Sequence, residues 1–338
     1  MYLKKNRTVP YMKAVDMHCD TIEAIYEAHR RGENASLREN DRMVDLKKLR
    51  AGDYELQTFA LFTHLEKAAG RPFEYCMELL DTFYEEMEAH REWIGPVRCY
   101  EDILENRRQG RMSALLSIEE GAVCQGKLAL LRDFYRLGVR MMTLTWNYPN
   151  ELGWPSRRSR KEDGSWLWLP ETERGLTETG LLFLEEMERL GIIIDVSHLG
   201  DAGIRDVLLH TKKPFVASHS NARALRNHPR NLTDEMIRQI GTRGGVIGIN
   251  YCPYFLEEGV ETSRISGILK HMEHIKKVGG IGCLGLGSDF DGIVGELEIK
   301  DASCLPALSA AMEKAGFSTG EIEAVFGGNA LRLFKELL

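Results

Sequence analysis

This 338-residue chain contains no apolar run approaching the roughly 20 residues that a membrane-spanning helix needs. Its basic start, residues 1–16, is not followed by the apolar segment of a secretory signal, so we expect neither a leader nor an anchor. The chain also lacks any cluster of lysine and arginine, and its formal net charge is −7. These absences argue against a membrane protein and against a nucleic-acid-binding protein.

The seven cysteines are scattered along the chain, and no two of them form a Cys-x-x-Cys pair. An odd number of dispersed cysteines does not suit a disulfide framework, so we expect reduced thiols and a cytoplasmic protein. Internal repeats and linkers rich in Pro, Gly and Ser are absent as well. Hydrophobic residues make up 43% and charged residues 28%, which is typical of a globular protein. We expect one domain over residues 1–338.

Short apolar runs, rich in β-branched residues, recur along the chain and predict strands. They cover residues 14–18, 56–62, 113–118, 140–145, 192–197, 215–218, 246–250 and 283–287. These runs lack the strict polar alternation of a half-exposed strand, which favours a parallel sheet buried on both faces.

Amphipathic stretches between and after these runs predict helices. The stretches cover residues 74–90, 179–190, 202–210, 233–242, 264–278, 306–315 and 319–337. Eight strands that alternate with helices favour a (β/α)8 TIM barrel, and a doubly wound open sheet is the alternative. Residues 147–173 are polar and rich in Trp, Pro and Arg, which predicts a long loop of the kind that forms lids or binding loops.

Six ionisable residues lie at the ends of five predicted strands. They are His18 and Asp20 after the first run, Glu119 after the third, His198 after the fifth, His219 after the sixth and Asp289 after the eighth. Residues i and i+2 of a strand share a face, so the first two side chains point the same way. Because all strand ends of a barrel converge on one mouth, three histidines and three carboxylates are expected to meet there.

Histidine nitrogen and carboxylate oxygen are the ligands expected for Zn2+ or a similar divalent cation. Six such groups exceed the need of one tetrahedral ion and suit two cations that share a bridging carboxylate and a bridging hydroxide. A purely structural role for the whole set is disfavoured, since burying several unpaired ionisable groups together is costly. The strand ends therefore predict a site for two divalent cations at the mouth of a TIM barrel.

Other polar residues of the chain do not indicate one role as clearly. Arg230, just ahead of a helix whose expected N-cap is Thr233, is either a surface arginine or a guanidinium that binds a substrate carboxylate. His228 lies beside it and is ambiguous. We expect Glu120 and Asp291 to support the loops or the metal ligands.

Several motifs resemble those of the renal or membrane dipeptidase family of zinc metallopeptidases. The motifs are DMHCDT at residues 16–21, SIEEG at 117–121, IDVSH at 194–198, ASHSNAR at 217–223, Arg-Asn at 230–231 and GSDFDG at 287–292. DLKKLRAG at 45–52 and GGNALRLF at 327–334 also look like the family. Together they span nearly the whole chain in the family's order.

The resemblance implies a (β/α)8 barrel with two zinc ions, other divalent metals being an alternative. The implied roles are one zinc on His18 and Asp20, the other on His198 and His219, Glu119 as the bridge, Arg230 on the substrate carboxylate and Asp289 as the acid/base residue. Family members cleave dipeptides, several accept a D-residue at the C-terminal position, and some open β-lactam rings. The resemblance also implies a homodimer with a small dipeptide as its substrate.

One residue departs from the family's pattern. The mammalian members carry a histidine directly after the TLT of the fourth strand, whereas this chain has Trp146 there. Tryptophan offers only an indole N–H and cannot take up a proton. We expect Trp146 to contact the substrate, with Asn147 or Asn150 supplying the missing polar contact.

Three alternative functions stay open. The first is another binuclear-zinc amidohydrolase, acting on N-acyl amino acids or lactams, and Trp146 is the residue that keeps it open. The second is a non-hydrolytic relative, such as an isomerase or a biosynthetic enzyme, because fold and metal do not fix the reaction. The third is a binding module with structural zinc, which is disfavoured because structural zinc sites are closed, Cys-rich and mononuclear.

Overall fold

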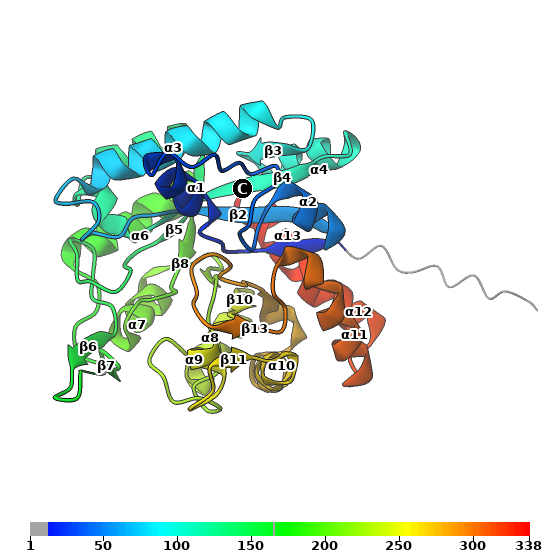
Figure 1. Ribbon diagram of the computed structural model, residues 1–338. Coiled ribbons are helices and arrows are strands. Elements are labelled where there is room, and N and C mark those ends of the chain that lie inside the picture. The colour runs from blue at the N-terminus through cyan, green and yellow to red at the C-terminus, as the bar shows by residue number, and fades with distance from the viewer. Residues whose placement is uncertain (1–12, 165) are drawn as a thin grey trace, which may run out of the picture.

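A closed barrel of parallel strands forms the centre of the computed structural model, which describes residues 13–164 and 166–338 (Figure 1). Its eight strands are β1 (Ala14–Asp16), β2 (Tyr54–Phe62), β4 (Met112–Glu119), β5 (Val139–Thr143), β8 (Ile193–Asp195), β9 (Val216–Ala217), β10 (Val246–Ile249) and β12 (Leu284–Leu286). They pair in the order β2-β1-β12-β10-β9-β8-β5-β4, and pairing of β2 with β4 closes the ring. The predicted (β/α)8 TIM barrel is confirmed, and each predicted run supplies one strand.

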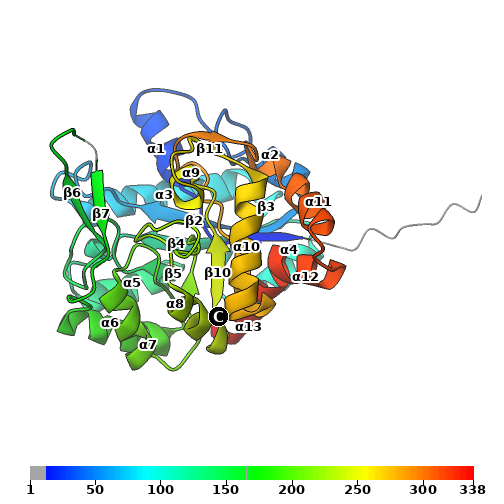
Figure 2. The ribbon, with the colours of Figure 1, turned by 90° about the horizontal axis from the view of Figure 1, so that it is seen from below.

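Helices surround the barrel, as the view from below shows (Figure 2). They are α1 (Thr21–Arg30), α2 (Leu46–Ala51), α3 (Pro72–Ala89), α4 (Tyr100–Arg108), α5 (Leu128–Arg136), α6 (Glu178–Leu190), α7 (Asp201–His210), α8 (Asp234–Thr242), α9 (Pro253–Leu256), α10 (Ile265–Gly279), α11 (Pro306–Lys314), α12 (Thr319–Glu323) and α13 (Asn329–Leu337). Because helices cover the outside and side chains fill the inside, every residue of β4 is buried. None of the helices in the described ranges is long and apolar enough to cross a bilayer.

Local sequence signals set the ends of these helices. The Thr233 side chain accepts a hydrogen bond from the Met236 amide, which confirms it as the N-cap of α8. Thr177 caps α6 in the same way, and Gly191 follows the last residue of α6 with a φ of 82°, in the left-handed region that glycine tolerates.

Two strand pairs and one edge strand lie outside the barrel ring. β3 (Ile94–Val97) pairs with the first half of β4, while β5 pairs with the second half. β3 was not predicted, because a four-residue segment containing Pro96 gives little strand signal; proline is tolerated there at an edge. A short pair, β11 (Thr262–Ser263) and β13 (Glu296–Leu297), lies apart from the barrel.

The predicted loop over residues 147–173 contains an antiparallel hairpin. Its strands are β6 (Arg157–Arg160) and β7 (Trp166–Leu169), and the hairpin projects from the body of the protein (Figure 1). Three of the four β6 residues are arginine, and this density of charge concealed the strand in the sequence.

The helix predicted over residues 319–337 is interrupted by a π-helical turn at Ala324–Gly328. Gly327 packs so closely on the chain entering β1 that a Cβ there would lie 2.7 Å from the Lys13 carbonyl oxygen. Asn329 then donates from its side chain to the carbonyls of Ile281 and Leu284, each at 2.8 Å. The π-helical turn therefore packs the C-terminal helices against the amino-terminal ends of β1 and β12.

Candidate metal centre and active site

Six buried ionisable side chains meet at the carboxyl ends of the barrel strands. They are His18, Asp20, Glu119, His198, His219 and Asp289. None of them is more than 9% exposed. Their ring nitrogens and carboxylate oxygens form three groups, in each of which the donor atoms lie within 4.8 Å of one another. The structure thus brings together all six residues that the strand ends point to.

Glu119, the last residue of β4, lies between two sets of donors. Its Oε2 is 3.3 Å from Nε2 of His18, and its Oε1 is 3.1 Å from Nε2 of His198. Nε2 of His219 lies 3.6 Å from the same Oε1, and Oδ1 of Asp20 lies 3.6 Å from Nε2 of His18. A carboxylate whose two oxygens face separate sets of donors can contribute one ligand atom to each set.

Several polar atoms of this cluster are buried without a hydrogen-bond partner. They are both ring nitrogens of His18 and Oδ1 of Asp20. On the other side, the Nε2 atoms of His198 and His219 face each other at 3.0 Å. Unpartnered buried polar atoms cost free energy, and a cation bound among them would use the lone pair of one His18 nitrogen and that of the Asp20 oxygen. Imidazole and carboxylate donors fit a divalent cation, so the cluster is the candidate metal site of this chain.

A relay behind His219 fixes which of its nitrogens faces the cluster. The Ser218 hydroxyl donates to Oδ2 of Asp195 at 2.6 Å, and Oγ of Ser218 lies 2.7 Å from Nδ1 of His219. Since the hydroxyl proton is used on the carboxylate, Oγ accepts from Nδ1–H. Nε2 therefore keeps its lone pair toward Glu119 and His198, as a metal ligand requires. Asp195 also accepts from the Thr143 hydroxyl at 2.7 Å.

His198 receives the same kind of support from Asn147. Nδ1 of His198 lies 3.0 Å from Oδ1 of Asn147, which leaves Nε2 to face the cluster. Asn147, expected at the substrate, thus contacts a metal-site histidine. His198 itself has a φ of 69°, an uncommon conformation for a residue with a side chain, and such strain often marks a functional position.

Asp289 has a different environment from the other carboxylates. Its Oδ2 accepts a hydrogen bond from the Asn250 side chain at 2.8 Å, while its Oδ1 lies 3.8 Å from Nε2 of His18. Burial raises the pKa of Asp289 to about 6, against the opposing charge of His18. A Cβ on Gly292 would lie 2.6 Å from Oδ1 of Asp289 and 2.0 Å from Oδ2 of Asp20, so this turn needs glycine.

Arg230 is a buried cation, only 5% exposed. No carboxylate forms an ion pair with it within the described ranges, and its Nε has no partner. One terminal nitrogen donates to the His219 carbonyl at 3.3 Å, and its backbone N–H donates to Nδ1 of His228 at 3.1 Å. Burial lowers the pKa of Arg230. A buried guanidinium with free N–H groups can receive an anion bidentately.

Trp146 lies in an aromatic cluster at the rim of the metal site. Its ring centroid is 4.9 Å from that of His64, 5.1 Å from Phe62 and 5.5 Å from Tyr148. The His198 ring lies 6.1 Å away on the side of the metal site. Trp146 is half-buried, so it forms part of the wall beside His198.

Glu120 and Asp291 hold loops, in line with the sequence analysis. Glu120, with a pKa that burial raises to about 7, accepts from the backbone of Ala122 and Trp146 and from the Asn150 side chain. Asn150 is thereby committed to the loop and not to the metal cluster. Asp291 accepts from the Thr21 hydroxyl and from the Met43 amide, each at 2.7 Å.

Sequence reasoning missed Asp195 and Asn250 as residues of the site. Both stood in predicted strands, at 192–197 and 246–250, and both are polar residues at a strand end. The strand-end signal that identified the metal-site residues could have found Asn250, whereas Asp195 lies inside the predicted run and becomes a strand end only in the observed β8.

Comparisons with known proteins agree with this geometry. The family described as membrane dipeptidase, peptidase family M19, matches residues 4–337. An uncharacterized dipeptidase of Schizosaccharomyces pombe is 32% identical over 306 residues, covering 87% of this chain and 72% of the relative.

Two solved structures are similar over nearly their whole length. One is the crystal structure of dipeptidase AC, a metallopeptidase of family M19, with a TM-score of 0.87 and 26% identity over 97% of this chain and 99% of that one. The other is a metallopeptidase of Rhodobacter sphaeroides liganded with a phosphinate mimic of the dipeptide L-Ala-D-Ala, with a TM-score of 0.87, 25% identity and the same coverage.

Proposed function

Because this chain belongs to the membrane dipeptidase family, peptidase family M19, we propose that it is a zinc-dependent dipeptidase. The observation that carries the proposal is Glu119, whose two oxygens face separate sets of histidines at 3.3 and 3.1 Å. On one side of it stand His18 and Asp20, and on the other His198 and His219. These five residues would hold two zinc ions, with Glu119 shared between them.

Bound zinc supplies two kinds of chemistry, a lowered pKa for water and a polarised substrate carbonyl. The chain's own residues prepare for this by presenting neutral imidazole nitrogens. The Asp195–Ser218 relay does so for His219, and Asn147 does so for His198.

Asp289 is the proposed acid/base residue. Its Oδ2 is occupied by the Asn250 amide at 2.8 Å, so its Oδ1, on the side of His18, is the oxygen that takes up a proton. A buried carboxylate in this position would accept a proton from water and return it to the departing amine.

Arg230 is the proposed receptor for the substrate's C-terminal carboxylate, because it is a buried cation with an unpartnered Nε. A carboxylate held this close to the metal-site residues limits the substrate to very short peptides. Trp146 would form the wall along which the substrate lies. The L-Ala-D-Ala mimic bound by the Rhodobacter sphaeroides metallopeptidase supports tolerance of a C-terminal D-residue.

Hydrolysis of a dipeptide panel tests the proposal. Purified protein reconstituted with zinc is incubated with dipeptides, including C-terminal D-residues, and with N-acyl amino acids, each with and without chelator. Products are followed by mass spectrometry. We expect dipeptide cleavage that stops on chelation. Cleavage of the N-acyl amino acids alone would assign the chain to the deacylase alternative, and turnover of nothing in metal-replete protein would overturn the proposal.

Two variants test the residue roles. Asp289→Asn is expected to keep its metal and lose most of its turnover, and near-normal turnover would remove Asp289 from the acid/base role. Arg230→Met is expected to raise KM for dipeptides with a free carboxylate far more than for their C-terminal amides. An equal rise on both would contradict the carboxylate assignment.

A homodimer, a single domain over residues 1–338 and a cytoplasmic location complete the proposal. All seven cysteines are free thiols, as suits a reducing compartment. The homodimer rests on the family resemblance, and sedimentation of the purified protein tests it.

A further inference from the structure

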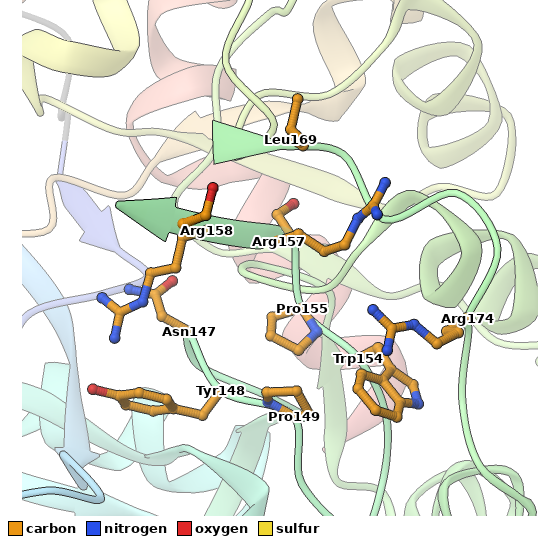
Figure 3. A pocket seen from close by; sticks show the side chains of 11 residues that line it. Asn147, Tyr148, Pro149, Trp154, Pro155, Arg157, Arg158, Leu169 and Arg174 are labelled. Atoms are coloured by element: carbon orange, nitrogen blue, oxygen red, sulfur yellow. The ribbon is translucent and has the colours of Figure 1, made fainter. Parts of the chain in front are cut away.

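A cavity of about 470 Å³ lies between the β6–β7 hairpin and the loop that follows β5, and its lining is rich in arginine (Figure 3). Among its lining residues are Asn147, Tyr148, Ser156, Arg157, Arg158 and Arg174, and no acidic residue lines it. On one side it reaches Asn147, which contacts the metal-site residue His198 at 3.0 Å. On the other it reaches Ser156, whose hydroxyl donates to the carbonyl of Pro229, next to Arg230. Asn147 and Ser156 therefore connect the cavity wall to His198 and to the Arg230 loop, although neither His198 nor Arg230 lines the cavity itself.

The three arginines of the cavity differ in their partners. Arg174 donates to Glu171 with two nitrogens, at 3.0 and 2.6 Å, and Arg157 lies 3.6 Å from the same carboxylate. Arg158 has no acidic partner in the part of the chain that the structure describes. In the close-up, Arg157 and Arg158 leave β6 in opposite directions, and Arg158 extends toward Tyr148 and Asn147 (Figure 3). Arg158 is thus the one of these three arginines without a direct ion pair in the described ranges, and the Tyr148 hydroxyl beside it donates to Glu66 at 2.9 Å.

Three aromatic rings lie around the Arg158 guanidinium. Its Cζ lies 4.7 Å from the ring centroid of Tyr148, 4.9 Å from that of Trp166 and 5.8 Å from that of Trp146. Contacts of this kind restrict the position of a guanidinium, and Arg158 also hydrogen-bonds to the Tyr148 hydroxyl. A guanidinium has five N–H donors, so this bond leaves others for a ligand.

The hairpin turns one face toward the site. Arg158 of β6 pairs directly with Trp168 of β7, and these two are the half-buried residues of the hairpin strands, the others being exposed. The Trp168 ring lies 5.4 Å from that of His228, whose Nδ1 accepts from the Arg230 backbone. Residues of the hairpin therefore contact the wall near His198 on one side and the Arg230 loop on the other.

We propose that Arg158 makes this cavity a receptor for a second carboxylate, so that the enzyme prefers dipeptides with an Asp or Glu side chain. The proposal rests on the proposed dipeptidase function and names its substrate class. Arg230 binds the backbone carboxylate, and the guanidinium edge of Arg158 binds the side-chain carboxylate of the same substrate. A cavity of this volume accommodates a residue side chain, and the bidentate geometry selects a planar anion over the amide of equal size.

Matched acid and amide substrates test this preference. We would measure kcat/KM for Ala-Glu against Ala-Gln, Glu-Ala against Gln-Ala, and the corresponding Asp and Asn pairs. The wild-type enzyme is expected to favour the acid in at least one pair by about tenfold or more, the effect of one charge-assisted hydrogen bond. Arg158→Met is expected to bring the acid-to-amide ratio of kcat/KM to about one. Arg158→Glu is expected to shift the preference toward Lys-containing dipeptides.

Arg160→Met is the matched control. Arg160 lies on the same strand two residues on and also stacks on Trp166, at 4.3 Å, yet it does not line the cavity. Its substitution is expected to leave the acid-to-amide ratio unchanged. Neutral dipeptides separate the two proposals: if no variant cleaves any dipeptide, the dipeptidase function fails. If neutral dipeptides are cleaved but the wild-type and Arg158→Met ratios agree, the role of Arg158 is refuted.

Discussion

His228 links acid stability to the geometry of the proposed carboxylate receptor. The residue is 8% exposed, and burial, followed by the charges of nearby arginines, lowers its pKa from 6.5 to about 3. Its Nδ1 accepts a hydrogen bond from the backbone N–H of Arg230 at 3.1 Å, which only an unprotonated nitrogen can do. We therefore expect acid to destabilise the fold at this point and to loosen Arg230.

The sign and size of the effect follow from proton linkage. With a folded pKa below the unfolded pKa, the unfolded chain binds a proton that the folded chain does not. The stability contributed by His228 is thus present above pH 6.5 and is lost as the pH falls from 6.5 toward about 3. Between pH 7 and pH 5 this loss is about 2 kcal/mol for the shift of that one group.

Replacement of His228 by Asn isolates this contribution. Asparagine keeps a short acceptor for the Arg230 amide but does not titrate. Urea unfolding at pH 7 and pH 5, with chelator present throughout, gives the loss of unfolding free energy for wild type and variant. We expect the variant to lose about 2 kcal/mol less than the wild type.

The control replaces a packing partner and keeps the titrating ring. Phe255 lies 4.8 Å from the His228 ring, so Phe255→Leu is expected to lower stability at both pH values by similar amounts. Equal pH 7 to pH 5 losses in wild type and His228→Asn would refute the assignment of a neutral, buried His228.

Substitutions at Gly292 and Asn147 probe the metal cluster. Gly292→Ala is expected to displace Asp20 and Asp289, which weakens metal binding while the fold is retained; metal content and circular dichroism measure the two effects. Gly282→Ala is the control, because a Cβ at Gly282 meets nothing within 4 Å. Asn147→Ala is expected to weaken metal binding about 10- to 100-fold in a chelator competition, because His198 loses the partner of its Nδ1. Asn147→Asp, which keeps an acceptor oxygen, is expected to restore most of that affinity, and a failure to do so would contradict the role of the acceptor.

The barrel and the metal cluster were predictable from the sequence for one physical reason. A buried parallel strand reads as an apolar run, and barrel closure carries the residue after each run to the same mouth. His18, His198 and Asp289 are far apart in the chain, yet topology alone brings them together.

Contacts between loops were not predictable in this way. The bond from Asn147 to His198 joins residues 51 positions apart, and nothing in strand periodicity determines which loop atoms meet. The β6–β7 hairpin escaped prediction because its first strand carries three arginines and no apolar alternation. The contact between Arg158 of this hairpin and the Tyr148 ring is visible only in the folded structure.

Metal titration tests the central claim most directly. Chelator-treated protein is titrated with Zn2+ while bound metal and dipeptide hydrolysis are measured on the same samples. We predict that hydrolysis rises with bound metal and saturates at two zinc ions per chain, and that Glu119→Gln binds less metal and loses activity. Full hydrolysis by metal-free protein, or zinc binding that leaves hydrolysis unchanged, would contradict the account.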